Sequence, residues 1–161
     1  MNKSTLTLAG ALLVGGGWWA QPRWLAHRLL HAEDDRSAAI LVLEASQDAA
    51  ALDLLVAGLP TATGLQQLRV AEALVRAGDL RGPPVCLALL DQPGLIGEEA
   101  WTLLHSAVVF PEEEPAPTWR PGSGAAERDA WAAGRAGVQV RPGDSVVDRF
   151  VLPPTPTPQR D

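Results

Sequence analysis

The sequence predicts a mostly α-helical protein in which short helices recur as pairs, followed by a C-terminal extension with one candidate β-hairpin. Between residues 22 and 110, apolar side chains recur every three or four positions, and glycine or proline interrupts them after about ten to fourteen residues. The pairs repeat: Pro60 and Pro93 lie 33 positions apart, and Leu55 and Leu89 lie 34 apart. Near the C-terminal end, valines alternate with polar residues around a Pro-Gly-Asp turn.

The composition fits one ordinary domain and argues against nucleic-acid binding. The chain has 161 residues, of which 47% are hydrophobic and 20% are charged, so it can bury a core. The net charge is -6, Lys3 is the only lysine, and no cluster of cations is present to displace the counterions of a phosphate backbone. Cys86, the only cysteine, has apolar neighbours and is predicted to be a buried, inert thiol.

Residues 1–21 are predicted to be a signal peptide or an uncleaved signal anchor. The stretch Leu6–Pro22 contains three consecutive glycines but lacks the lysine and hydroxyl residue of a phosphate-binding loop. Instead, Lys3 precedes an apolar run, as in an export signal. Ser4–Pro22 is uncharged over 19 residues, which is close to the length that spans a bilayer, and its tryptophan pair suits the interface. The anchor is slightly favoured. Both alternatives place the protein in the cell envelope, and the anchor would contact the membrane through this N-terminal helix.

Six helices are expected between residues 22 and 109, several of them with recognisable ends. Their ranges are 22–31, 34–46, 48–60, 63–79, 82–94 and 97–109. Asp48 is a predicted N-cap, and Gly78 is predicted to end the fourth helix. Glu98 and Glu99 are predicted to lie in the first turn of the sixth helix, at the positive end of its dipole. The fourth helix is expected to place four apolar residues on one stripe, Leu65, Leu68, Ala71 and Val75.

Residues 51–79 resemble HEAT-like repeats of the short bacterial type. In these repeats a first helix ends near a proline or aspartate turn, and a second helix follows the pattern R-x-A-A-E-A-L-x-x-x-G-D. The residues that resemble this pattern are Arg69, Ala71, Glu72, Ala73, Leu74, Gly78 and Asp79. The resemblance extends at most over 33–109. It is best over 51–79, because the second unit departs from the pattern, with Trp101 in its helix and no Gly-Asp ending. It implies that residues 22–110 stack as a small α-solenoid, a type of scaffold that usually binds proteins, and it carries no catalytic residue over.

The composition changes after the sixth helix. Residues 111–125 are acidic and proline-rich and are predicted to be a linker, in which Trp119 either clamps the linker to the helices or waits for a partner. Residues 126–152 are predicted to hold a short helix, with Trp131 directed inward, and the candidate hairpin. Residues 153–161 are predicted to be a proline-rich tail.

Histidines supply the one candidate for metal chemistry in the sequence. His27 and His31 are four residues apart and share a helix face, with Glu33 or Asp34 as a third ligand. An arginine stands where a zinc peptidase would carry its general-base glutamate, and its charge opposes a bound cation. We therefore predict no metal, no cofactor and no catalytic residue. His105 is expected to be partly buried, with a backbone or carboxylate partner.

These features predict a non-enzymatic adapter, exported or membrane-anchored, that binds another protein in the cell envelope through its helix faces. Two alternatives stay open. The first is a metal-binding or metal-dependent enzyme that uses His27 and His31. The second is a membrane-assembly component that acts through its N-terminal helix.

Overall fold

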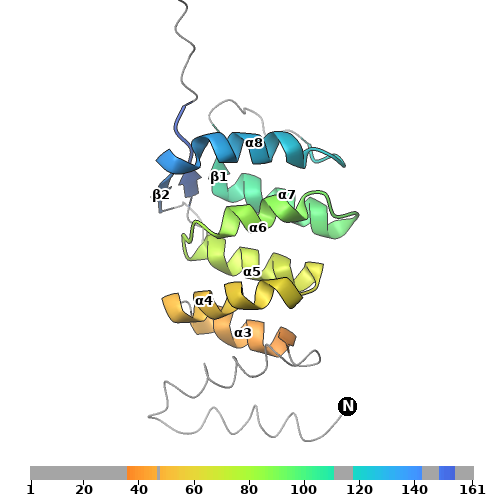
Figure 1. Ribbon diagram of the computed structural model, residues 1–161, viewed down its shortest axis with the longest axis vertical. Helices are drawn as coiled ribbons and strands as arrows, with labels where there is room; N and C mark the ends of the chain where they lie inside the picture. Colours follow the sequence, from red (N-terminus) through yellow and green to blue (C-terminus); the bar gives the residue numbers. More distant parts are fainter. Residues whose placement is uncertain (1–35, 47, 111–117, 143–148, 155–161) are drawn as a thin grey trace, which may run out of the picture. The chain divides into compact units, whose positions relative to one another are not determined.

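The computed structural model describes residues 36–46, 48–110, 118–142 and 149–154 (Figure 1). The described chain is mostly helical, with six α-helices and a small three-stranded sheet near the C-terminal end. The predicted signal peptide or anchor and the histidine pair lie outside the described residues. Among the residues that are described, no helix is both long and apolar enough to cross a lipid bilayer. The chain forms two compact units, Met1–Gly58 and Leu59–Asp161.

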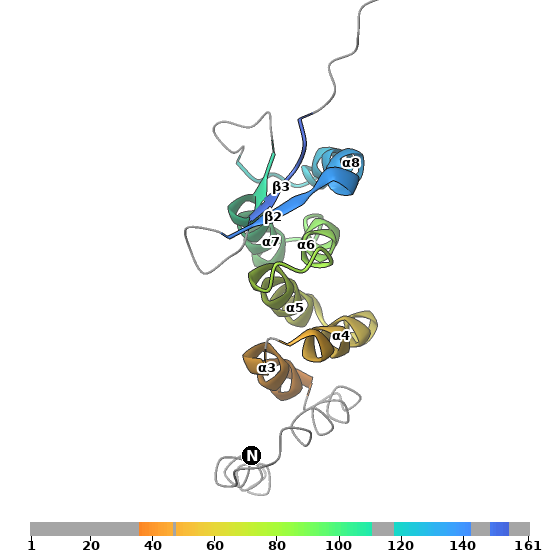
Figure 2. The same cartoon turned by 90° about the vertical axis from the view of Figure 1, so that its left-hand side faces the viewer.

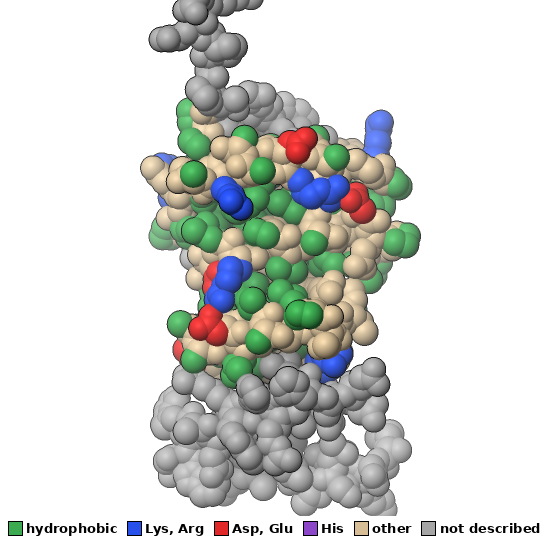
Figure 3. Space-filling model, viewed as in Figure 1, with side chains coloured by type: hydrophobic (Ala, Val, Ile, Leu, Met, Phe, Trp, Pro, Cys, Tyr) green, Lys and Arg blue, Asp and Glu red, His purple; other side chains and the backbone are tan. Residues whose placement is uncertain are grey.

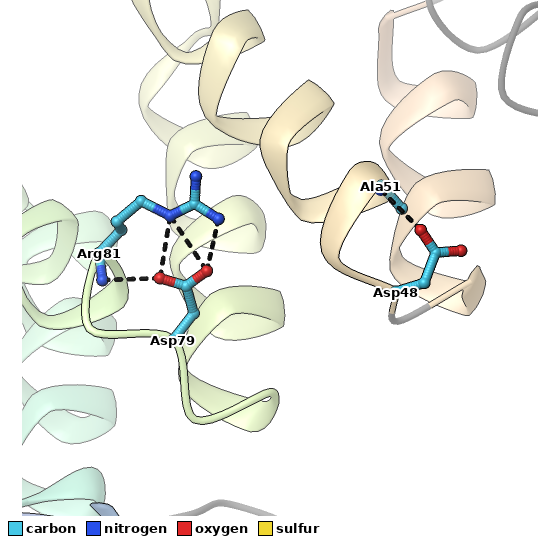
Figure 4. Close-up of polar contacts among 4 residues, drawn as sticks. All are labelled: Asp48, Ala51, Asp79 and Arg81. Carbon is cyan, nitrogen blue, oxygen red and sulfur yellow. Dashed lines mark hydrogen bonds and ion pairs between the residues drawn. The ribbon is translucent and has the colours of Figure 1, made fainter. Parts of the chain in front are cut away.

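The described part of the first unit consists of two packed helices, α3 (Arg36–Ser46) and α4 (Ala49–Gly58). Their buried apolar side chains are Ala39, Ile40 and Leu43 on α3, and Ala51, Leu52 and Leu55 on α4. Asp48 caps α4, because its Oδ1 accepts a hydrogen bond of 2.9 Å from the backbone N–H of Ala51 (Figure 4). The predicted N-cap is confirmed.

The second unit begins with three helices that pack on one another, α5 (Gly64–Arg76), α6 (Gly82–Leu89) and α7 (Leu95–Ala107), after a short 3-10 turn, η1 (Leu59–Thr61). Two prolines occupy the first positions of α6, where a missing N–H costs little. Glu98 lies in the first turn of α7, as predicted, but Glu99 does not, because the helix begins two residues earlier than expected, at Leu95.

Gly78 ends α5, as the sequence predicts. Its φ of 65° is in the left-handed region, where glycine carries no Cβ penalty. Its N–H donates to the carbonyl of Val75 at 3.0 Å, and the N–H of Asp79 donates to the carbonyl of Leu74 at 2.9 Å. These two bonds form a Schellman motif, which satisfies carbonyls at the helix end.

The apolar stripe predicted for α5 is wrong at one position. Ala71 and Val75 are fully buried and Leu68 is partly buried against the core, but Leu65 is 61% exposed. The physical reason is that the buried residues of α5 lie in its second half. In its first turn it is Gly64, and not Leu65, that approaches a neighbouring helix: a Cβ on this glycine would lie 2.9 Å from Cδ1 of Ile96.

The C-terminal part of the second unit consists of α8 (Gly124–Gly134), a 3-10 turn, η2 (Arg135–Gly137), and a sheet (Figure 2). The strands are β1 (Val108–Val109), β2 (Gln139–Arg141) and β3 (Arg149–Val151), in the order β1-β3-β2. β2 and β3 are antiparallel, so the candidate hairpin is confirmed. β1 pairs with β3 in parallel.

The sheet corrects the expected end of the sixth helix. That helix was predicted to continue to residue 109, but α7 ends at Ala107 and the next two valines form β1. β-branched residues favour strands, and a partner strand whose paired residues lie 42 positions further along the chain supplies their hydrogen bonds. Phe150 at the centre of β3 is fully buried, and its ring meets that of Trp131 edge-on with centroids 6.3 Å apart. Trp131 therefore points inward, as predicted.

Candidate interaction surface

His105 and Glu127 form a buried pair between α7 and α8. His105 Nε2 lies 3.6 Å from Glu127 Oε1, and the two side chains are 9% and 6% exposed. The imidazole stacks near Trp101 and Phe110, with ring centroids 4.1 and 5.4 Å away. The expected carboxylate partner of His105 is confirmed. Because both groups are closed off from water and from any substrate, this arrangement joins two helices rather than presenting an acid–base pair.

Cys86 is also unsuited to chemistry. It is fully buried in α6, and desolvation raises the pKa of its thiol to about 12. The thiolate is the reactive form of cysteine, so this side chain is inert near neutral pH, as predicted. Within the described residues, no group of three or more His, Cys, Asp or Glu side chains is placed to hold a metal ion. His27, His31, Glu33 and Asp34 fall outside those residues.

Asp79 and Arg81 fix the turn between α5 and α6 (Figure 4). Asp79 Oδ1 accepts hydrogen bonds from the backbone N–H and from Nε of Arg81, both at 2.9 Å. Asp79 Oδ2 accepts from Nε at 3.0 Å and from Nη2. The side-chain hydrogen bonds from Arg81 lower the pKa of Asp79 and outweigh the opposing effect of burial. Gly78 and Asp79, which resemble the Gly-Asp ending of the repeat pattern, are thus structural here. The sequence analysis did not identify Arg81 as the hydrogen-bond partner of Asp79.

We expect Asp79→Asn to lower the free energy of unfolding at pH 7 by about 0.5–1 kcal/mol. The figure is small because the Arg81 side chain is 41% exposed and water screens the pair. Asp79 has a lowered pKa in the folded state, so its contribution is present above the ordinary value of 3.8 and is lost as the pH falls through the lowered one. Urea unfolding at pH 7 and at low pH measures this. A gap between wild type and variant that stays constant at low pH would contradict it, and Glu72→Gln, in an exposed ion pair with Arg76, is the control.

Trp119 clamps the linker to the helices, which is one of the two roles predicted for it. Its Nε1 donates a hydrogen bond to the carbonyl of Leu90 at 3.3 Å. Its ring packs against Gly97, because a Cβ added to this glycine would lie only 2.9 Å from Cζ2 of Trp119. A second tie is made by Arg128 of α8, which donates to the carbonyl of Leu87 at 3.0 Å and pairs with Asp91 at 2.7 Å. Both ties use the C-terminal end of α6, where carbonyls lack helical partners.

Two large leucines are exposed where the first turns of α5 and α7 meet. Leu65 is 61% exposed and Leu95 is 68% exposed. The contact between Gly64 and Ile96 brings these turns together. We call Leu65 and Leu95 the leucine patch. Figure 3 shows hydrophobic side chains spread over the visible face of the helices, among groups of basic and acidic side chains. An exposed apolar group of this kind is a candidate contact for another protein.

Comparisons of the chain with protein-family models, with curated proteins and with solved structures gave no match. The resemblance of residues 51–79 to HEAT-like repeats stays a prediction.

Proposed function

We propose that the protein is a non-enzymatic helical-repeat adapter of the cell envelope, which binds another protein through its helix faces. In this proposal the helices stack as a small HEAT-like solenoid, and residues 1–21 export the chain or anchor it in the membrane. The observation that carries the proposal is the leucine patch. Covering an exposed leucine gains up to about 1.5–3 kcal/mol, so a partner that buries Leu65 and Leu95 would gain from both.

The placement of the reactive side chains also supports a binding role. Cys86, His105 and Glu127 are of types that suit nucleophilic or acid–base chemistry. Cys86 and Glu127 are buried, and the side chain of His105 is only 9% exposed. Their burial favours a role in holding the helices together, because a catalytic group must reach its substrate.

The test is crosslinking of the full-length protein in its own cells. A photoreactive amino acid replaces Leu65 in one variant and Leu95 in another, and the envelope fraction is analysed by mass spectrometry. We expect both positions to yield an adduct with the same protein. The adduct formed at position 65 should decrease when Leu95 is also changed to Asp, because the charge breaks the apolar contact.

The control position is Ala132, an exposed residue of α8 that does not belong to the leucine patch. Adducts at 65 and 95 that are absent, or identical to those formed at 132, would overturn the adapter proposal. The same fractions report whether the protein is recovered with membranes, which tests the envelope location.

A further inference from the structure

The register of the small sheet separates its two faces. Residues directly opposite one another point to the same face, and each strand alternates between faces. Val108, Val140 and Phe150 share the face that contains the buried Phe150 ring. The other face, which we call the basic face, carries Val109, Gln139, Arg141, Arg149 and Val151.

Two arginines lie directly opposite each other on the basic face. Arg141 of β2 pairs with Arg149 of β3, and both side chains are exposed. Arg141 donates to Gln139 Oε1 at 2.9 Å, but neither arginine makes an ion pair with a described carboxylate. Like charges placed directly across a strand pair are unfavourable. Among the described residues, the two guanidinium groups therefore lie opposite each other with no carboxylate paired to either, and an anion bound there would reduce their repulsion.

Three other arginines of the same unit have a carboxylate partner. Arg76, Arg81 and Arg128 pair with Glu72, Asp79 and Asp91. Arg141 and Arg149, by contrast, have no carboxylate partner among the described residues, although the net charge of the protein is -6.

Protection of a sheet edge does not explain both arginines. Charged residues on edge strands prevent aggregation, and this accounts for Arg141 because β2 is an edge strand. Arg149 is on β3, which is the central strand and is paired on both sides. Edge protection therefore does not account for the charge of Arg149.

We propose that the basic face binds an acidic, extended segment of the partner protein, a proposal that rests on the adapter function above. Carboxylates of the segment pair with Arg141 and Arg149, and its alternate apolar residues cover Val109 and Val151. Val109 is 38% exposed, so it offers apolar area to a partner. An extended peptide presents alternate side chains to one face, which matches a surface that combines guanidinium groups with valines. Two arginines are too few for a nucleic-acid backbone, which requires a larger set of cations.

The test uses the full-length protein and a fluorescent twelve-residue peptide of alternating Glu and Val, with binding followed by anisotropy at low salt. The variant R141Q/R149Q removes both charges, and R120Q removes an exposed arginine away from the sheet. We expect R141Q/R149Q to bind roughly two- to twentyfold more weakly and R120Q to bind like wild type. Added salt should weaken wild-type binding, because the pairs are exposed. A thermal melt at least as high as wild type shows that R141Q/R149Q is folded, since the repulsion is gone.

Equal affinity of R141Q/R149Q and wild type would overturn the proposal, as would equal binding of a peptide with Lys in place of Glu. Arginine-dependent binding to vesicles of phosphatidylglycerol, or to inorganic phosphate, that matches the peptide's would also overturn it, because the face would then recognise any anion. If the crosslinks at Leu65 and Leu95 persist while these tests fail, the adapter function stands and only this surface assignment is wrong.

Discussion

His105→Leu is expected to lower the free energy of unfolding at pH 7 by about 3–5 kcal/mol. The substitution places an apolar side chain of similar size between Trp101 and Phe110. It also removes the imidazole that lies 3.6 Å from the Glu127 carboxylate. Burying a carboxylate that has lost its partner costs folding free energy.

The matched variants are Glu127→Leu and the double variant that carries both substitutions. Glu127→Leu should cost less than His105→Leu, because the remaining imidazole can be buried uncharged. The double variant should recover much of the stability, since an apolar pair replaces two polar groups. Urea unfolding of the four proteins gives the coupling energy between the two residues. Additive single effects would show that the two side chains do not interact.

Phe150→Ala is expected to cost about 3–5 kcal/mol of unfolding free energy. Phe150 is fully buried on the central strand, and its ring packs edge-on against Trp131 of α8. Alanine removes the whole ring, so a cavity opens between the sheet and α8. The measurement is chemical unfolding followed by tryptophan fluorescence, because Trp131 itself borders the cavity.

The control for Phe150→Ala is Val151→Ala, one residue further along on the opposite, basic face. It should cost less than about 1 kcal/mol, since a half-buried valine contributes little packing. Similar losses for the two variants would mean that strand propensity, and not the packed face of the sheet, stabilises this region.

Features that depend on nearby residues were predictable from the sequence. Asp48 caps α4 because its side chain bonds to an N–H three residues on, and Gly78 ends α5 because it alone lacks a Cβ at that point. The burial of Cys86 followed from its apolar neighbours, and the antiparallel β2–β3 pair followed from alternating valines around a turn. Each of these is set within about ten residues, where spacing and residue type carry the information.

Contacts between distant segments were decided only by the tertiary structure. The carboxylate that meets His105 comes from α8, Trp119 donates to a carbonyl 29 residues earlier, and the valines after α7 became a strand because β3 lies beside them. The same packing exposed Leu65, whose helical spacing predicts burial, and placed Arg141 opposite Arg149. Periodicity identifies a side chain's face on its own element, but burial and partners depend on which other element covers that face, and this information is spread over the whole chain.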